Sequence, residues 1–258
     1  MKTQSKTVVF ITGAFVGHNS WKNWKTYFEN KGYNVIVPAW PHKDADPATL
    51  RKRQPDAALG QLNLAQLIAH FEKIVRELPE KPILIGHSLG GLITQILLQK
   101  NIAAAGIAVH SAPPKGVSPV SYAFLRSAWG AFGLFKPAKT THLMSFKEWQ
   151  WAFANGMTEA EQRASYEELA IPEARQVIRD GISDITKVDF DKKQQPLLFI
   201  AGTEDHFFSP KVNHDNYSRY KNSKSVTDYK VFEGINHGVL GLPTWQNQAD
   251  YAFNWLNN

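Results

Sequence analysis

A serine flanked by glycines is the first group in this sequence whose neighbours suggest chemistry. Residues 86–90 read Gly-His-Ser-Leu-Gly, the G-x-S-x-G pattern of a nucleophile held on a sharp turn between a strand and a helix. An apolar segment, Ile83–Ile85, leads into this turn, and a helix is expected to begin at Leu89. Small residues two positions on either side relieve crowding in such a turn, and the start of a helix favours negative charge. We therefore predict that Ser88 is a nucleophile.

A serine hydroxyl attacks well only when a base takes its proton, so a histidine and an acid are expected downstream. In this pattern the order along the chain is serine, acid, histidine. Asp205 follows the apolar segment Leu197–Ala201, and His237 follows the last apolar segment of the same kind. Both therefore fall in loops after strands, where the catalytic groups of open α/β sheets gather. We predict a triad of Ser88, His237 and Asp205, with Glu204 as the rival acid.

Acyl transfer also needs hydrogen-bond donors for the oxyanion. One expected donor is the backbone N–H of Leu89, the residue after the nucleophile. The second is expected from the loop after the first strand, residues 12–17, whose glycines allow the backbone to approach a substrate closely. We predict Ala14 as this donor, with Phe15 as the alternative. His18 follows in the same loop and is a candidate substrate contact.

Six short apolar segments are expected to form the strands that position these groups, and longer amphipathic segments are expected to form helices. Continuous apolar strands separated by helices indicate an α/β fold, with a mostly parallel six-stranded sheet covered by helices on both faces. The helices are predicted over residues 21–31, 61–78, 89–100 and 245–256. The predicted strands are Val8–Ile11, Val35–Val37, Ile83–Ile85, Ile107–Val109, Leu197–Ile200 and Tyr229–Phe232.

The alternation of strands and helices breaks between residues 113 and 195. This stretch is rich in aromatic residues and helix formers, and no convincing strand is visible in it. We interpret it as a helical cap insertion, and residues 1–112 with 196–258 as the core domain. Trp129 and Trp149 of the cap are candidate substrate contacts. Because large aromatic side chains are mostly buried in any domain, packing of the cap interior is an equal alternative.

Composition narrows the possible functions further. The chain has 258 residues, 43% apolar and 20% charged, as an ordinary globular protein does. It contains no cysteine, which excludes disulfides, zinc–thiolate sites and a cysteine nucleophile. The net charge is +6, but the basic residues are dispersed, and we interpret the densest run, Arg51–Arg53, as a solvated loop. A nucleic-acid partner is therefore not expected.

Cofactors and membranes are also not expected from the sequence. No metal-ligand spacing, phosphate loop or dinucleotide pattern is present, so we predict neither a metal nor a cofactor. No apolar stretch reaches the roughly 18 residues that cross a membrane. The apolar run from Val8 to Val16 is not followed by a small-residue cleavage site. We therefore expect a cytoplasmic protein without a membrane span.

On these motifs the chain resembles the α/β-hydrolase fold superfamily over residues 7–257. It is most similar to small capped serine esterases, including the plant methylesterase and hydroxynitrile lyase group. That family usually carries His-Gly before its oxyanion residue, where this chain has Thr12-Gly13. Hydroxynitrile lyases typically place a lysine after the acid, whereas this chain has His206. The resemblance thus implies esterase rather than lyase chemistry.

Together these observations predict a serine hydrolase that cleaves a carboxylic ester or thioester of a small, largely apolar substrate through an acyl-enzyme. His237 would take the proton of Ser88, and Asp205 would hold the imidazole. Two alternatives stay open: a lyase or carbon–carbon hydrolase with the same triad, and a non-catalytic ligand-binding protein on this fold. The sequence leaves the physiological substrate and the oligomeric state undetermined.

Overall fold

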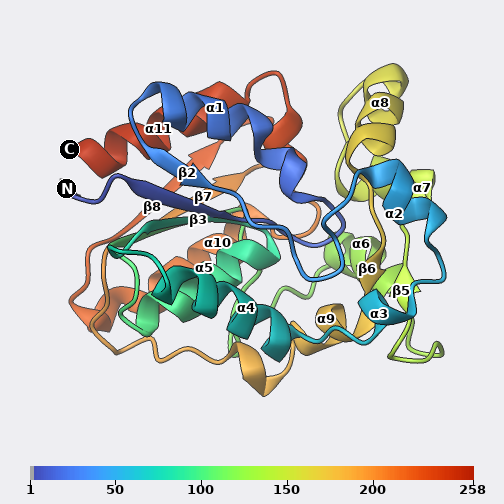
Figure 1. The fold of residues 1–258 in the computed structure, drawn as a ribbon, viewed down its shortest axis with the longest axis horizontal. Coiled ribbons are helices and arrows are strands. Elements are labelled where there is room, and N and C mark those ends of the chain that lie inside the picture. The colour runs from blue at the N-terminus through green and yellow to red at the C-terminus, as the bar shows by residue number, and fades with distance from the viewer. Residues whose placement is uncertain (1–2) are drawn as a thin grey trace.

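The computed structural model describes residues 3–258, so residues 1 and 2, the start of the predicted core domain, lie outside the described residues. Its centre is a six-stranded sheet whose neighbouring strands all pair in parallel. The predicted sheet between layers of helices is confirmed (Figure 1). In spatial order the strands are β2 (Asn34–Ile36), β1 (Thr7–Ile11), β3 (Ile83–His87), β4 (Ala105–Val109), β7 (Leu197–Gly202) and β8 (Thr227–Phe232).

The four central strands are buried at every residue, whereas the edge strands β2 and β8 are partly exposed. Burial on both faces explains why the central strands read as continuous apolar runs in the sequence. The chain passes from β1 to the edge strand β2 and then returns to β3, on the other side of β1. The carboxyl ends of β1 and β3 therefore flank the point where the strand order reverses, which is where open α/β sheets bind ligands.

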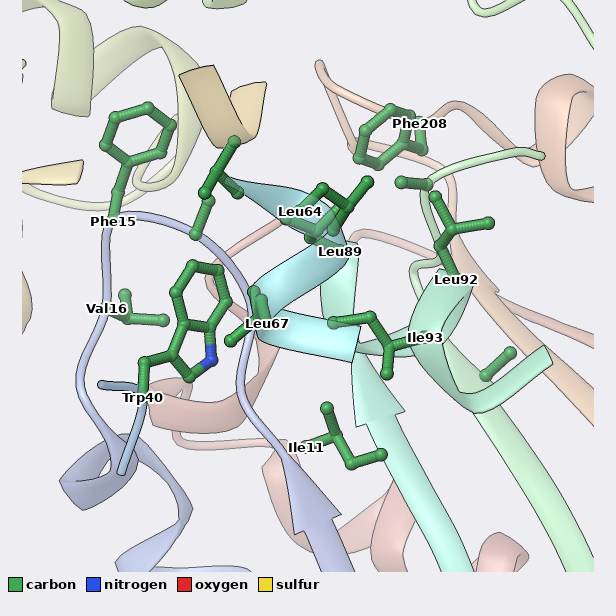
Figure 2. Close-up of a cluster of buried hydrophobic side chains, with 14 of the residues drawn as sticks. Ile11, Phe15, Val16, Trp40, Leu64, Leu67, Leu89, Leu92, Ile93 and Phe208 are labelled. Atoms are coloured by element: carbon green, nitrogen blue, oxygen red, sulfur yellow. The ribbon is translucent and has the colours of Figure 1, made fainter. Parts of the chain in front are cut away.

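Helices cover both faces because alternate strand residues point to opposite sides of the sheet. In β1, Phe10 packs into the buried cluster on one face and Ile11 into the cluster on the other. Figure 2 shows Ile11 in this second cluster together with Leu67 and Ile93. The covering helices are α1 (Lys22–Asn30) and α11 (Trp245–Asn257) on the first face, and α4 (Leu64–Arg76), α5 (Leu89–Gln99) and α10 (Pro210–Arg219) on the second.

The four predicted helices are present with shifted ends. The helix predicted over residues 61–78 begins later, at Leu64, because Asn63 and Gln66 form a capping box in which each side chain accepts the other's backbone N–H. The helix predicted over residues 21–31 is preceded by a 3₁₀ turn, η1 (His18–Trp21). Within the described part of the core domain, three α-helices were not predicted, α10 and the short α2 (Pro47–Lys52) and α3 (Ala57–Gly60). Across residues 3–258, no helix combines the length and apolar character needed to cross a membrane.

The chain between β4 and β7 holds the elements that we treat as the cap, defined as residues 113–195. It is mostly helical, but β5 and β6 pair antiparallel, so the expectation that this stretch lacks strands was wrong. The ladder is two residues long on each side, too short to produce a periodic pattern in the sequence. The cap elements are α6 (Tyr122–Phe132), β5 (Thr141–His142), α7 (Phe146–Ala152), α8 (Glu159–Leu169), β6 (Glu173–Ala174), α9 (Arg175–Asp180) and η2 (Asp184–Thr186).

The helices α2 and α3 belong to the core by sequence but pack on the cap, α2 against α8 and α3 against β5 and β6 (Figure 1). Arg51 of α2 donates hydrogen bonds to the carbonyl oxygens of Glu167 and Ala170, at 3.0 and 2.8 Å. These carbonyls end α8, where a helix has unpaired acceptors and favours a positive charge. The interpretation of Arg51–Arg53 as a solvated loop was therefore wrong for Arg51, which joins the core to the cap.

Candidate active site

The turn after β3 holds Ser88 in a backbone conformation that few residues other than glycine adopt. Its φ is 57° and its ψ is −121°. Glycines on either side make the turn possible: a Cβ on Gly86 would lie 2.0 Å from the carbonyl oxygen of Gly90, and one on Gly90 would lie 2.0 Å from that of Ile11. Strained conformations of this kind cluster at functional sites, so the pattern in the sequence has the geometry that it predicted.

Three strand ends bring the predicted triad together. The Ser88 hydroxyl lies 3.0 Å from His237 Nε2, and His237 Nδ1 lies 2.8 Å from Asp205 Oδ2. A carboxylate can only accept, so His237 carries its proton on Nδ1 and its Nε2 is free to accept the hydroxyl proton. All three side chains are buried, whereas the rival acid Glu204 is exposed. This geometry is that of a serine activated by a neighbouring base.

Asp205 is held as a carboxylate by four donors. Its Oδ1 accepts the backbone N–H groups of Phe207 and Phe208, at 2.7 and 2.9 Å. Its Oδ2 accepts from His237 and from a second imidazole, His110, both at 2.8 Å. Burial raises the pKa of this carboxyl, but the electrostatic attraction of His237 and the hydrogen bonds from His110 and His237 outweigh burial and hold the pKa below its ordinary value. The acid of the triad is therefore ionised at neutral pH.

His110 is a member of this cluster that the sequence analysis did not consider. It directly follows β4, is completely buried, and has a positive φ of 49°. Burial, partly offset by Asp205, lowers the pKa of His110, so the ring is neutral and donates through Nδ1. The rule that located Asp205, a polar residue at the carboxyl end of a predicted strand, applies equally to His110 after Ile107–Val109 and could have found it.

The remaining buried histidine of the site is His87, inside the turn. Its Nε2 lies 3.0 Å from the carbonyl oxygen of His237 and donates to it. Burial lowers the pKa of His87 well below its ordinary value, with His237 and His110 adding to the effect. The neutral His87 imidazole therefore supports the backbone of the loop that carries His237. Its ring makes no hydrogen bond to Ser88.

The predicted oxyanion loop lies directly beside the nucleophile. A Cβ on Gly13 would lie 2.7 Å from Ser88 Cβ, so only glycine permits this approach. The N–H of Phe15, the alternative donor, is taken by the carboxylate of Glu173 at 3.1 Å. Ala14 and Leu89 both line the cavity in front of Ser88. Of the two candidates from this loop, the geometry therefore favours Ala14 over Phe15.

Glu173 fixes this loop from the cap. It is completely buried and forms an ion pair with the buried Lys43, whose Nζ lies 2.6 Å from Oε2. The Lys43 ammonium also lies 3.8 Å from the centre of the Trp40 ring, and the Trp40 indole donates to the carbonyl oxygen of Thr12. Both ends of the oxyanion loop are thus anchored, one by the Glu173 carboxylate and the other by Trp40.

An apolar cavity of about 490 Å³ opens in front of Ser88 and His237. Most of its wall comes from the cap and from the loop after Asp205, including Phe124, Trp129 and Phe208. Trp129, a predicted substrate contact, lies in this wall, and its contact with substrate stays a prediction. Pockets of this size and character are typical of small-molecule sites in enzymes.

Two predicted substrate contacts do not line this cavity. Trp149 is buried inside the cap, where its indole donates to Ser165 Oγ at 3.0 Å and its ring stacks on Phe153 at 4.3 Å. It supports the wall through Phe153, which does line the cavity. His18 begins η1 and lies outside the lining as well. These expectations were wrong because position in a loop or cap does not determine which way a side chain points.

A metal could be held, among the described residues, by the cluster of His110, Asp205 and His237, whose ligand atoms lie within 4.8 Å of one another. Both Nδ1 atoms, however, point to the same carboxylate oxygen at hydrogen-bond distance. Each contact is accounted for by one proton, and an ion would have to replace both hydrogen bonds. The donor set therefore fits a hydrogen-bonded triad better than a metal centre.

Comparison with known proteins assigns the family. Residues 8–252 match the model of the alpha/beta hydrolase family, so the chain belongs to that family and is a hydrolase. A search among curated proteins gave no match. The predicted resemblance to this superfamily is thereby confirmed.

Several solved structures share the fold over nearly the whole chain. A methylesterase from Arabidopsis is 19% identical, covers 97% of this chain and 98% of its own, and has a TM-score of 0.65. An extracellular alpha/beta-hydrolase from a Paenibacillus species is 18% identical, with coverages of 96% and 98% and a TM-score of 0.71. A monoacylglycerol lipase from Paleococcus ferrophilus is 16% identical, with coverages of 99% and 96% and a TM-score of 0.68. At these identities the likeness is one of fold.

Proposed function

We propose that this protein hydrolyses carboxylic esters, or thioesters, of a small and largely apolar substrate through an acyl-enzyme on Ser88. The observation that carries the proposal is the 3.0 Å contact between the Ser88 hydroxyl and His237 Nε2, backed by Asp205, at the floor of an apolar cavity. A binding protein has no physical need for a strained serine that is hydrogen-bonded to an imidazole, which is hydrogen-bonded in turn to a buried carboxylate.

The mechanism follows from these positions. His237 accepts the Ser88 proton at Nε2 as the hydroxyl oxygen attacks the carbonyl carbon, and Asp205 stabilises the imidazolium that forms. The oxyanion accepts hydrogen bonds from the N–H groups of Leu89 and Ala14. His237 then gives the proton to the leaving alcohol or thiol as the carbon–oxygen or carbon–sulfur bond breaks. Water, deprotonated by His237, attacks the acyl-enzyme and releases the acid, which restores Ser88.

The lining of the cavity supports an apolar substrate. Its wall is almost entirely apolar, and Lys115 is one of the few polar residues in it besides the triad members. An apolar acyl or alcohol group would therefore gain free energy by leaving water, whereas a charged group would lose its hydration and, among the described residues, find Lys115 as the one charged side chain in the lining. The volume of about 490 Å³ admits a medium-sized chain or ring system in addition to the ester itself.

The lyase alternative receives no support from a specific contact. His206 stands where the resemblance places a lysine in hydroxynitrile lyases. Its Nδ1 lies 2.7 Å from the carbonyl oxygen of Trp151, its ring packs on the Trp151 ring, and it does not line the cavity.

We propose a small-molecule partner rather than a nucleic acid, and a cytoplasmic location that cell fractionation would test.

The test compares two serine variants on p-nitrophenyl esters of increasing chain length. Ser88→Ala should lower kcat by about 10⁴-fold or more, because the nucleophile is removed while the fold is retained. Ser218→Ala, near the carboxyl end of α10 and outside the cavity lining, is the matched control and should be unchanged. A fluorophosphonate probe should label the native protein and not Ser88→Ala. Full activity of Ser88→Ala, or labelling at another residue, would refute the proposal.

A further inference from the structure

The cap exposes large apolar side chains around the opening of the cavity. We call Val120, Leu125, Trp129, Leu134 and Ile182, with the adjoining Tyr122 and Phe135, the mouth patch. The first five are exposed and also line the cavity, so they surround its opening. Of the nine exposed large apolar side chains in the described chain, all but Val226 lie in the cap. Apolar surface concentrated in this way marks a place of contact with another molecule.

The chain segment that carries most of the mouth patch is basic. Residues 113–147 contain no aspartate or glutamate and five basic residues, which are Lys115, Arg126, Lys136, Lys139 and Lys147. All five are exposed. The acidic side chain that pairs with one of them is Asp184, 3.3 Å from Lys115. Apolar side chains interspersed with basic ones, most of which lack an acidic partner in the same segment, are typical of segments that lie on anionic lipid.

We propose that the mouth patch rests on an anionic lipid surface, so that an apolar ester passes from the lipid into the cavity without crossing water. Entry of substrate rests on the function proposed above, but binding to the surface does not. A second copy of the chain is a poorer occupant. In a two-fold dimer the same patch meets itself, which would bring the basic residues of both copies together.

The experiment uses the inactive Ser88→Ala protein and sedimentation with vesicles. Vesicles of phosphatidylcholine with about one third phosphatidylglycerol should bind the protein, and pure phosphatidylcholine should bind it much less. Binding to the anionic vesicles should weaken with salt, because the attraction is screened. Phe135→Ser, which removes a side chain that is 96% exposed, should weaken binding severalfold. Val226→Ser is the matched control. Val226 is exposed and precedes β8, at the amino ends of the parallel strands, whereas the cavity lies at their carboxyl ends.

Charge reversal separates the lipid from other occupants. Lys136→Glu with Lys139→Glu should weaken vesicle binding by about 25-fold or more, because each basic group near such a surface contributes about fivefold. Lys221→Glu with Lys224→Glu, exposed lysines outside the cap, should have little effect. Equal effects of the two pairs, or no binding to anionic vesicles, would overturn the proposal. So would a dimer in sedimentation velocity that Phe135→Ser dissociates, since the patch would then belong to a second copy.

A soluble substrate keeps this proposal separate from the proposed function. Phe135 does not line the cavity, so the Phe135→Ser variant should hydrolyse p-nitrophenyl acetate in solution as fast as the native protein. Loss of vesicle binding with intact hydrolysis would support the surface and leave the chemistry untouched. If the native protein binds vesicles but hydrolyses no ester, the lipid-binding proposal stands and the proposed esterase function is rejected.

A second inference concerns the shared carboxylate. Asp205 Oδ2 accepts from both His110 and His237 at 2.8 Å, and Oδ1 already accepts two backbone N–H groups. The His110 ring is enclosed: a Cβ on Gly202 would lie 2.6 Å from its Cε1, and its Nε2 is buried without a hydrogen-bond partner. A left-handed backbone and an unpartnered nitrogen both cost free energy, which indicates a role for this imidazole.

We infer that His110 is a positioning residue, which fixes Asp205 and limits how strongly the carboxylate stabilises protonated His237. A second donor on the same oxygen withdraws negative charge from the first hydrogen bond. The titratable groups that face this cluster are His87, His110, His237 and Asp205, all buried. The inference rests on the proposed function, because it concerns the base of that mechanism.

The test is the pH profile of kcat/KM. His110→Phe keeps an aromatic ring but removes the donor, so Asp205 should stabilise imidazolium more strongly. The acidic limb of the profile should then move to higher pH by about half a unit to one unit. His110→Asn retains a donor and should restore the native profile, while His214→Phe, an exposed histidine on α10, is the control.

Two outcomes would overturn the inference. One is an unshifted acidic limb in His110→Phe, and the other is the same shift in His110→Asn. Should His110→Phe fail to fold, the proton NMR spectrum of the native protein decides: two downfield imidazole N–H resonances are expected, and a single one would contradict the shared carboxylate. Inactivity of Ser88→Ala with an unshifted His110→Phe profile would reject only the role of His110.

Discussion

Replacement of Glu173 by glutamine removes a charge and almost no volume from the link between cap and core. The Lys43 ammonium would then be buried without a counterion, since both side chains are at most 2% exposed. Removing one partner of a buried pair costs about 3–5 kcal/mol, and the lower end applies because the amide oxygen can still accept the N–H of Phe15. For a chain of this length that loss corresponds to a fall in Tm of roughly 10 °C.

Differential scanning calorimetry of four proteins would measure this. Glu168→Gln is the control, because its pair with Lys22 is exposed and should contribute less than about 1 kcal/mol. The double variant Lys43→Met with Glu173→Gln should recover most of the lost stability, since no buried charge remains and the acceptor for Phe15 is kept. Equal Tm values for Glu173→Gln and Glu168→Gln would refute the reasoning, as would a double variant no better than Glu173→Gln.

Three further predictions follow from the cavity and the triad. Ala128→Phe fills the cavity and should lower kcat/KM for long-chain relative to short-chain p-nitrophenyl esters by roughly tenfold, whereas Ala58→Phe, on the exposed surface of α3, should leave this ratio unchanged. Ionised Asp205, with its lowered pKa, stabilises the fold above its ordinary pKa and loses this contribution as pH falls through the lowered value. Asp205→Asn should therefore flatten the dependence of unfolding free energy on pH below about pH 4, and an unchanged slope in acid titrations would contradict the assignment. Dialysis against EDTA should leave ester hydrolysis intact, and a loss restored by added zinc would instead assign His110 and its neighbours to a metal.

The sequence predicts the sheet and the triad because both depend on local patterns. Each central strand is buried on both faces and therefore reads as an apolar run. In a parallel sheet the carboxyl ends of the strands share one edge, so Ser88, Asp205 and His237 could be brought together without coordinates. The role of the glycines around Ser88 could be predicted from the steric requirements of a sharp turn alone.

What the sequence did not predict depends on contacts between distant segments. The pair of Lys43 and Glu173 joins residues 130 positions apart, and no local pattern marks either as buried. Arg51 looked like part of a charged surface run until α8 placed open carbonyls beside it. Trp149 and Trp129 are the same residue type in the same cap, yet one packs inside it and the other lines the cavity.

The packing of α2 and α3 on the cap has a consequence for protein engineering. A chimera that received residues 113–195 from another family member would keep Lys43 and Arg51 but lose the carboxylate and the carbonyls that they bind. The stretch from Trp40 to Leu62 would then face a foreign surface with a buried cation. The unit that can be transplanted to alter specificity is therefore discontinuous, two stretches of chain that must be exchanged as one.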